Sequence, residues 1–262
     1  MGVLLPMGIL GAMGAVFGVG LAAASKVFEV KVDERVAQVR EFLPGANCAA
    51  CGYSGCDGYA EAVVSGEAKP NKCPVGGQAA AAAIAGVMGV EAGSQQKMVA
   101  RVRCLGTTGS CGEKYEYNGI ADCTAASLVS GGPKSCTYGC MGFGSCVKAC
   151  QFDAIYMYEG IACVSAERCT ACGQCVRSCP KSLIELVPED KQYIVSCTNR
   201  DKGGVTRKAC SVGCIGCMRC VKACEYGAVT VENNLAVIDY EKCQSCGECV
   251  KACPQSCINL YY

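Results

Sequence analysis

The sequence predicts an α+β protein in which one N-terminal transmembrane helix is followed by several small, cysteine-rich modules. Three observations predict this fold class. Residues 1–25 carry no charged side chain, 27 of the 262 residues are cysteine, and much of the cysteine pattern recurs after 74 residues. Only 6% of the residues are aromatic and Trp is absent, so the modules cannot bury a large conventional core and need another source of stability.

The apolar N-terminal segment, Met1 to Ser25, is long enough to cross a membrane. At about 1.5 Å per helical residue it can span a hydrocarbon core of about 30 Å. The nearby positive charges, Lys26, Lys31 and Arg35, follow this segment, and by the positive-inside rule they keep the remainder of the chain in the cytoplasm. The sequence therefore predicts a single-pass protein of the cell (inner) membrane, with a cleaved signal peptide ending near Ala22-Ala23-Ala24 as the alternative.

The composition narrows the chemistry to thiolates. An odd number of cysteines at repeated two-residue spacings fits metal ligation better than a disulfide scaffold. Because the chain has no His, Rieske centres, mixed cysteine–histidine zinc sites and imidazole bases are excluded. The net charge is only +1, and positive and negative side chains are interspersed, so the sequence shows no basic patch for nucleic acid. Neither DNA nor RNA is therefore expected as a partner.

The first cysteine motif, Cys48-x2-Cys51-x4-Cys56-x16-Cys73-Pro74, supplies the four thiolates that one [4Fe-4S] cluster needs. Glycines within the motif let the backbone curl so that its amides face the cluster. A structural zinc ion on the same thiolates is the alternative, although zinc ribbons use two Cys-x2-Cys knuckles. After Pro74, residues 78–90 are rich in Ala and predict a helix, and residues 91–96 read as a linker.

An internal repeat occupies the rest of the chain. A shift of 74 positions superposes the cysteines without a gap, which predicts two tandem copies of one module. The predicted division is a transmembrane anchor at 1–25, a four-cysteine domain with its linker at 26–97, and two modules at 98–188 and 189–262. The superposed pairs are Cys123/Cys197, Cys136/Cys210, Cys140/Cys214, Cys146/Cys220, Cys150/Cys224, Cys169/Cys243, Cys172/Cys246, Cys175/Cys249 and Cys179/Cys253.

The second copy predicts two clusters with exchanged ligands. This copy has two rows of four cysteines. The first three thiolates of a row, spaced three residues apart, bind one cube, whereas the fourth cannot reach that cube and binds the other. Between the two rows, residues 229–232 and 235–238 flank Asn233-Asn234 and predict a β-hairpin. The arrangement resembles the bacterial two-cluster ferredoxin, a compact α+β fold. The predicted ligand sets are Cys214, Cys217, Cys220 with Cys253, and Cys243, Cys246, Cys249 with Cys224.

The first copy departs from this pattern because Phe143 stands where the second copy has Cys217. One cluster keeps its full set, Cys169, Cys172, Cys175 and Cys150, whereas the other retains only Cys140, Cys146 and Cys179. We predict that Cys136 replaces the missing ligand. Its counterpart Cys210 persists where no ligand is missing, so replacement alone does not explain both residues.

Five clusters use 20 cysteines and leave seven over. A sixth cluster drawn from Cys104, Cys111, Cys123 and one further thiol is one hypothesis, and buried, inert free cysteines are the other. The remaining unassigned thiols are Cys163, Cys197, Cys210 and Cys257.

The chain carries no recognisable nucleotide motif. No Gly-x-Gly-x-x-Gly follows a predicted strand and no Gly-x4-Gly-Lys-[Ser/Thr] is present, so we expect no dinucleotide or nucleotide site in this chain. Four basic residues adjoin predicted cluster ligands and could dock an acidic electron carrier, or could simply be solvated side chains. These residues are Lys148, Arg177, Lys222 and Lys251.

Taken together, the motifs resemble the B subunits of Rnf complexes over essentially the whole chain. The resemblance rests on the uncharged anchor, Leu43-Pro44-Gly45, the first cysteine motif with Gly52-Tyr53-x-Gly55, Tyr59-Ala60-Glu61-Ala62, Cys73-Pro74-x-Gly76-Gly77 and the two ferredoxin-type modules. It is similar to the longer members of that family, because shorter members have one module.

The resemblance implies an electron-transfer subunit of a membrane-bound ferredoxin:NAD⁺ oxidoreductase that translocates Na⁺ or H⁺. Such a subunit would accept electrons from soluble ferredoxin and relay them to other subunits, which carry the flavins and the nicotinamide site. The first domain, nearest the anchor, would be the exit. The alternatives are a component of the homologous system that reduces a redox-sensing transcription factor, and a zinc-stabilised, membrane-tethered interaction module.

Overall fold

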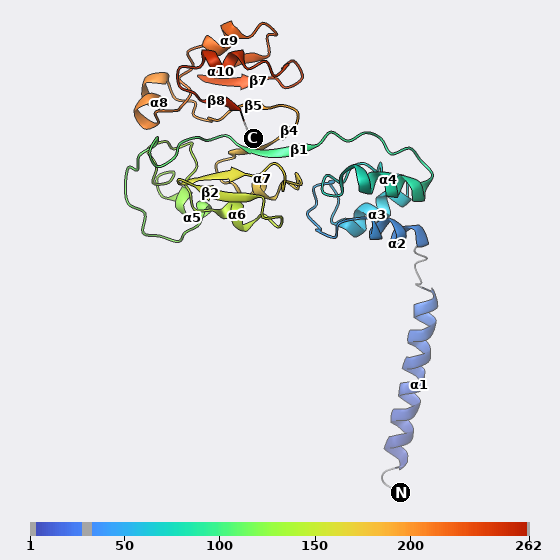
Figure 1. The fold of residues 1–262 in the computed structure, drawn as a ribbon. Coiled ribbons are helices and arrows are strands. Elements are labelled where there is room, and N and C mark those ends of the chain that lie inside the picture. The colour runs from blue at the N-terminus through green and yellow to red at the C-terminus, as the bar shows by residue number, and fades with distance from the viewer. Residues whose placement is uncertain (1–3, 28–32, 261–262) are drawn as a thin grey trace.

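A computed structural model describes residues 4–27 and 33–260 of the chain (Figure 1). The N-terminal helix α1, Leu4–Val27, extends away from the rest of the chain, and its large apolar side chains between Met7 and Leu21 are exposed. The segment Met7–Lys26 is long and apolar enough to cross a membrane. The predicted apolar helix is therefore present, whereas residues 1–3 of the predicted anchor and Lys31 lie outside the described residues.

Three helices form the first domain around a small core. They are α2, Glu34–Glu41, α3, Cys56–Val64, and α4, Gly77–Met88. The helix expected over residues 78–90 is confirmed, and it ends at Gly89, whose φ of 65° is the left-handed conformation typical of a helix C-terminus. Val39, Tyr59 and Ile84, one from each helix, are fully buried and close the core.

The first module, which follows the linker, has two antiparallel strand pairs and three short helices. Strand β1, Met98–Val102, pairs with β4, Ile184–Pro188, and β2, Ile155–Tyr158, pairs with β3, Ile161–Val164. The helices are α5, Cys123–Leu128, α6, Ser145–Lys148, and α7, Gln174–Ser178.

The second module repeats this plan. Strand β5, Tyr193–Val195, pairs with β8, Ile258–Leu260, and β6, Val229–Glu232, pairs with β7, Leu235–Ile238. Its helices are α8, Gly203–Ala209, α9, Arg219–Ala223, and α10, Glu248–Ala252. The predicted hairpin is confirmed, with Asn233 and Asn234 both at positive φ, as a two-residue hairpin turn requires.

The strand registers correct one pair in the predicted repeat. Val102 pairs with Ile184 and Val195 pairs with Ile258, and the two isoleucines are 74 positions apart. Val102 therefore corresponds to Val195, and Cys104, two residues further on, corresponds to Cys197. Matching Cys123 with Cys197 was wrong in structural terms, because the first copy carries 19 additional residues before Cys136, and Cys123 lies within that stretch.

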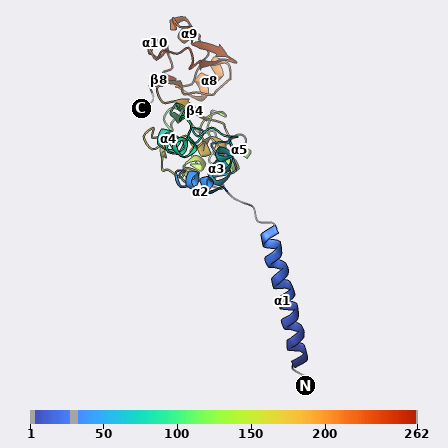
Figure 2. The same ribbon diagram turned by 90° about the vertical axis from the view of Figure 1, so that its right-hand side faces the viewer.

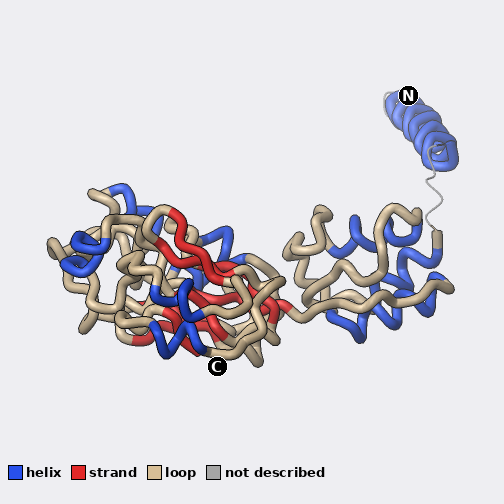
Figure 3. The backbone as a smooth tube through the Cα atoms, turned by 90° about the horizontal axis from the view of Figure 1, so that it is seen from above, coloured by secondary structure: helices blue, strands red, loops and turns tan. Residues whose placement is uncertain are grey.

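The modules follow one another in space as in sequence. The second module lies against the first, the first domain lies beside the first module, and α1 extends away from the first domain (Figures 1 and 2). Seen from above, the two strand-containing modules overlap and the helical first domain lies to one side (Figure 3). The predicted boundaries near residues 97 and 188 fall between elements, and the division into separate domains stays a prediction.

Candidate iron–sulfur sites

The second module brings together the two crossed thiol sets expected from its spacing. One pocket is lined by the three closely spaced cysteines of the first row and by the last cysteine of the second row, and another pocket is lined by the reverse combination. The structure thus reproduces the expected grouping, while ligation itself remains a prediction. The first set is Cys214, Cys217, Cys220 and Cys253, and the second is Cys224, Cys243, Cys246 and Cys249.

Backbone amides point at the sulfurs of these sets. Ala228 N donates to Cys224 Sγ at 3.3 Å, and Ala236 N donates to Cys214 Sγ at 3.5 Å. The β6–β7 hairpin supplies the second of these donors, because Ala236 lies on β7. Amide hydrogen bonds to cluster-binding sulfurs stabilise the charged state and tune its reduction potential.

In each module, a glycine in the first row of cysteines allows the backbone to approach the neighbouring hairpin turn closely. Gly216 has a φ of +63°, and a methyl group placed on it would lie 2.9 Å from the carbonyl oxygen of Asn234 in the hairpin turn. Gly142, its repeat counterpart, has a φ of +86° and would meet the carbonyl oxygen of Gly160 at 2.8 Å. Only a residue without a side chain fits at either position.

The intact set of the first module is also assembled. Burial raises the pKa of Cys175 to about 11, and the nearby Cys169, Cys172 and Cys150 act on it electrostatically. Ala100 N of β1 donates to Cys169 Sγ at 3.3 Å, and Ala154 N donates to Cys150 Sγ at 3.3 Å. The bond from Ala154 N to Cys150 Sγ corresponds in the repeat to the bond from Ala228 N to Cys224 Sγ.

In the incomplete set of the first module, the three remaining thiols lie with a cysteine that sequence reasoning assigned elsewhere. Cys123 lines one pocket together with Cys140, Cys146 and Cys179, whereas Cys136 lines a different pocket. The geometry therefore favours Cys123 over the expected Cys136 as the replacement for the cysteine missing at Phe143. The shift of 74 positions concealed this, because it matched Cys123 with Cys197.

A polar network holds Cys123 in place. Asp122 caps α5 by accepting from Thr124 N at 2.8 Å and Ala125 N at 3.0 Å. Ser145, at the start of α6, donates to the Asp122 carboxylate at 2.7 Å and accepts from Cys123 N at 2.8 Å. The capped helix is thus joined to the helix that carries Cys146.

The first domain brings three of its four predicted ligands, Cys51, Cys56 and Cys73, into one core cluster at the start of α3. Burial raises the pKa of Cys73, and the nearby Cys51 and Cys56 add to the shift. Asn47 Oδ1 accepts from Cys56 N at 2.9 Å, and Gly76 N donates to Cys73 Sγ at 3.4 Å. Cys48, the fourth ligand expected from the spacing, is buried and precedes Cys51 in the same loop, and its membership of the set stays a prediction.

Arg177 joins this domain to the first module. Its Nη2 atom donates to Cys48 O at 2.8 Å and to Cys172 O at 3.5 Å. Arg177, one of the four basic residues considered for docking, is therefore engaged in an internal bridge between two thiol sets. Its repeat counterpart Lys251 instead pairs with Glu248 on the exposed face of α10.

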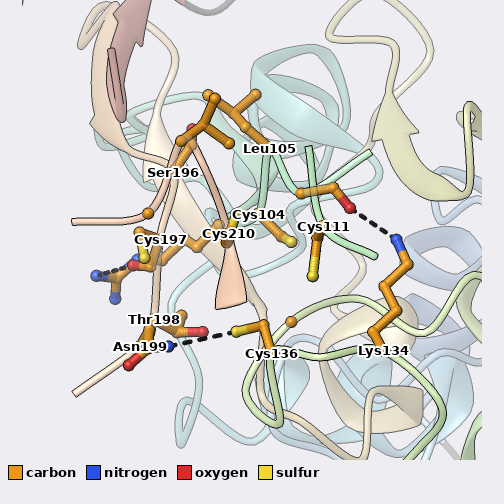
Figure 4. Close-up of a pocket in the computed structure, with 15 residues that line it drawn as sticks. Cys104, Leu105, Cys111, Lys134, Cys136, Ser196, Cys197, Thr198, Asn199 and Cys210 are labelled. Atoms are coloured by element: carbon orange, nitrogen blue, oxygen red, sulfur yellow. Dashed lines mark hydrogen bonds between the residues drawn. The ribbon is translucent and has the colours of Figure 1, made fainter. Parts of the chain in front are cut away.

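A further group of thiols lies where the two modules meet (Figure 4). None of the five sets above uses them, and sequence reasoning did not bring Cys136, Cys197 and Cys210 together with Cys104 and Cys111. The second module has no missing ligand and still contains Cys210, and this was the signal in the sequence that Cys210 has a role outside the five sets. The lining cysteines are Cys104, Cys111, Cys136, Cys197 and Cys210.

The thiol sets fit iron–sulfur cubes. Burial raises the pKa of Cys146 to about 12 and that of Cys249 to about 11, so a cluster bound at these two positions must displace the thiol proton. In the described part of the chain, no three Cys, Asp or Glu side chains converge closely enough to hold a single ion. A zinc ion would need four sulfurs about 2.3 Å from one point, whereas a cube keeps its thiolates apart.

Comparison with known proteins places these sites in a family. Models for an Fe-S cluster, a 4Fe-4S binding domain and a 4Fe-4S dicluster domain match residues 43–75, 166–182 and 213–257. The chain is 53% identical over 98% of its length, and 78% of the relative's, to the B subunit of the Na⁺-translocating ferredoxin:NAD⁺ oxidoreductase complex of Acetobacterium woodii. It is 42% identical to the B subunit of the ion-translocating oxidoreductase complex of Methanosarcina acetivorans, over 96% of each chain.

A third relative is the B subunit of the proton-translocating ferredoxin:NAD⁺ oxidoreductase complex of Clostridium ljungdahlii, 44% identical over 89% of this chain and 83% of the relative. The first of these names states Na⁺, the third states protons, and the second states no particular ion. Identity of this extent, over 89–98% of the chain, shows that the chain belongs to the family of B subunits of Rnf-type ion-translocating oxidoreductase complexes.

Proposed function

We propose that this chain is the electron-transfer subunit of an ion-translocating ferredoxin:NAD⁺ oxidoreductase, and that it accepts electrons from reduced ferredoxin and delivers them to other subunits. Bound [4Fe-4S] clusters would supply one-electron chemistry at each site. The observation that carries the proposal is the presence of a thiol set in every module, from the second module, where Cys217 and Cys246 are exposed, to the domain that follows α1 in the chain.

The two ends of this series differ in exposure. In the second module Cys217 and Cys246 are exposed, so this module presents two of its sets to a soluble partner. In the first module Cys172, the repeat counterpart of Cys246, is buried, and Arg177 bridges its carbonyl oxygen to that of Cys48. This contrast supports the second module as the docking site for ferredoxin and the first domain as the exit.

Five clusters follow from these sets, with Cys123 in the place first assigned to Cys136. Backbone amides donate to sulfurs of these sets, among them Cys73, Cys150, Cys169, Cys214 and Cys224, and this environment supports cluster binding in a reduced compartment. The cytoplasmic orientation of the modules rests on Lys26 and Arg35, which follow the apolar helix.

Anaerobic reduction by ferredoxin tests the function. The full chain in detergent, reconstituted with iron and sulfide, should lose its broad visible absorption when catalytic amounts of reduced ferredoxin and a ferredoxin-reducing system are added. Substitution of exposed Lys251 by Glu should slow this reaction, and more so at low ionic strength, if docking is electrostatic. Failure of reduced ferredoxin to bleach a protein that dithionite bleaches would refute the assignment of the donor.

Removal of residues 1–25 tests the anchor. The truncated chain should be soluble, should bind and reduce its clusters as the full chain does, and should no longer assemble with its membrane partners. Co-purification with tagged partner subunits provides the measurement. Retained assembly of the truncated chain would contradict the anchoring role.

A further inference from the structure

The junction between the two modules is built around thiols that the five sets leave unused. Arg103 spans it, with Nε donating to Val195 O at 3.3 Å and Nη2 donating to Cys197 O at 3.4 Å. On the opposite side, Ser211 N donates to Ser110 O at 3.0 Å. The junction is therefore a bonded interface, and the pocket within it has walls from both modules.

Two glycines show which thiols converge. A methyl group placed on Gly106 would lie 3.6 Å from the Sγ atoms of both Cys104 and Cys210, and 3.3 Å from the Cβ atom of Cys111. A methyl group on Gly139 would lie 3.6 Å from Cys104 Sγ and 3.7 Å from Cys136 Cβ. The bare backbone at these positions leaves the pocket open between the thiols (Figure 4).

We propose that Cys104, Cys111, Cys136 and Cys210 ligate a sixth [4Fe-4S] cluster shared between the two modules. Three of the ligands come from the first module and Cys210 comes from the second. The geometry assigns this cluster a ligand set different from the one considered from the sequence, because Cys123 belongs to the neighbouring set.

The surroundings suit a negatively charged cluster. Lys134 lines the pocket and is only 3% exposed, with Nζ donating to Gly106 O at 2.7 Å and to Gly160 O at 3.0 Å. Asn199, also buried, donates from Nδ2 to Cys136 Sγ at 3.4 Å. The residues that line this pocket include no carboxylate, so the charge of Lys134 is not neutralised by one of them. The buried cation therefore compensates the negative charge of four thiolates and the iron–sulfide core.

The fifth thiol, Cys197, lies at the edge of this group. Its Sγ atom accepts from Cys214 N at 3.3 Å, and it packs within the core of the second module. Cys104 makes the corresponding bond with Cys140 N at 3.3 Å but also approaches both glycines of the pocket. We therefore assign Cys197 as a neighbour of the cluster and not as a ligand.

These two bonds also locate the site between existing sets. Cys140 belongs to a set of the first module and Cys214 belongs to a set of the second, so the shared site adjoins both. A role in connecting the modules electronically rests on the proposed function, whereas binding of the cluster does not.

Iron counting on the reconstituted full chain tests the site. Wild type should bind about 24 iron atoms, and Cys111→Ser and Cys210→Ser should each lose about four, together with one EPR-active centre. The double variant should also lose only about four, because both residues serve one cluster. Cys197→Ser is the matched control and should retain the wild-type count by native mass spectrometry.

The proposal is overturned if Cys111→Ser or Cys210→Ser retains all the iron, if the double variant loses about eight atoms, or if Cys197→Ser loses a cluster. The proposed function fails separately, when six clusters are counted and reduced ferredoxin does not reduce them. Cluster counting uses no activity measurement, so the two failures are distinguishable.

Discussion

Replacement of Cys123 by Ser should remove one cluster from the first module, and a cysteine at position 143 should restore it. The backbone at Phe143 follows Gly142, just as Cys217 follows Gly216, and both glycines have positive φ beneath a hairpin carbonyl. A thiol at position 143 is therefore expected to face the site as Cys217 does. The Cys123→Ser, Phe143→Cys double variant is the critical protein.

The magnitudes follow from the structure. Loss of one cube should remove about four of about 24 iron atoms, and the double variant should recover them. Phe143 packs against Tyr117 with ring centroids 5.2 Å apart, and losing this pair costs about 0.5–1.5 kcal/mol of stability beyond the lost burial of the half-buried Phe143 ring. That cost is small beside a domain stability of about 5–15 kcal/mol, so Phe143→Cys alone should fold with its full iron content.

Iron and acid-labile sulfide analysis of anaerobically purified protein provides the assay, with Cys136→Ser as the matched comparison. Cys136→Ser should also lose about four iron atoms, from the junction, but Phe143→Cys should not restore them. If Phe143→Cys restored the iron lost from Cys136→Ser but not that lost from Cys123→Ser, Cys136 and not Cys123 would be the replacement ligand. Full iron content in Cys123→Ser would refute it equally.

Three further outcomes are expected. Gly216→Ala should lower the free energy of unfolding by about 1–2 kcal/mol because of its positive φ, with a further loss from the clash with the hairpin carbonyl, and should lower cluster occupancy on reconstitution. Gly204→Ala is the control and should leave both unchanged, because nothing lies within 4 Å of a methyl group placed there. Arg177→Met should expose the linker at residues 91–97 to faster limited proteolysis, whereas Lys251→Met should leave the cleavage rate unchanged. Lys134→Met should lower the reduction potential of the junction centre in an EPR-monitored titration while Lys134→Arg preserves it, and a raised potential in the Met variant would contradict the charge argument.

Much of the second module could be predicted from the sequence because its constraints are local. Thiolates three residues apart can only bind one cube, and the return of the fourth cysteine is forced by crowding. The Asn233-Asn234 turn is likewise a short-range signal, since both residues tolerate positive φ. The apolar helix and the helix after Pro74 were also predictable from composition within one segment.

The ligand at the incomplete set could not be predicted, because it depends on contacts between distant segments. Cys123 precedes Cys140 by 17 positions and reaches its set through the Asp122 and Ser145 network. An ungapped shift of 74 matches it with Cys197, and only the pairing of β1 with β4 shows that Cys104 holds that place. The cysteines at the junction are still less accessible to sequence reasoning, since Cys210 meets Cys104 and Cys111 only after both modules have folded and docked.

The additional residues before Cys136 explain several departures of the first module at once. They supply Cys123 to the set that lacks a cysteine at position 143, and they bring Tyr117 against Phe143, at the place where the second module leaves Cys217 exposed. The same stretch carries Cys111 to the junction. The same stretch therefore provides both the side chain that packs against position 143 and the cysteine that we expect to replace a ligand there. On the proposed function, this contrast leaves the second module as the more accessible of the two to soluble ferredoxin.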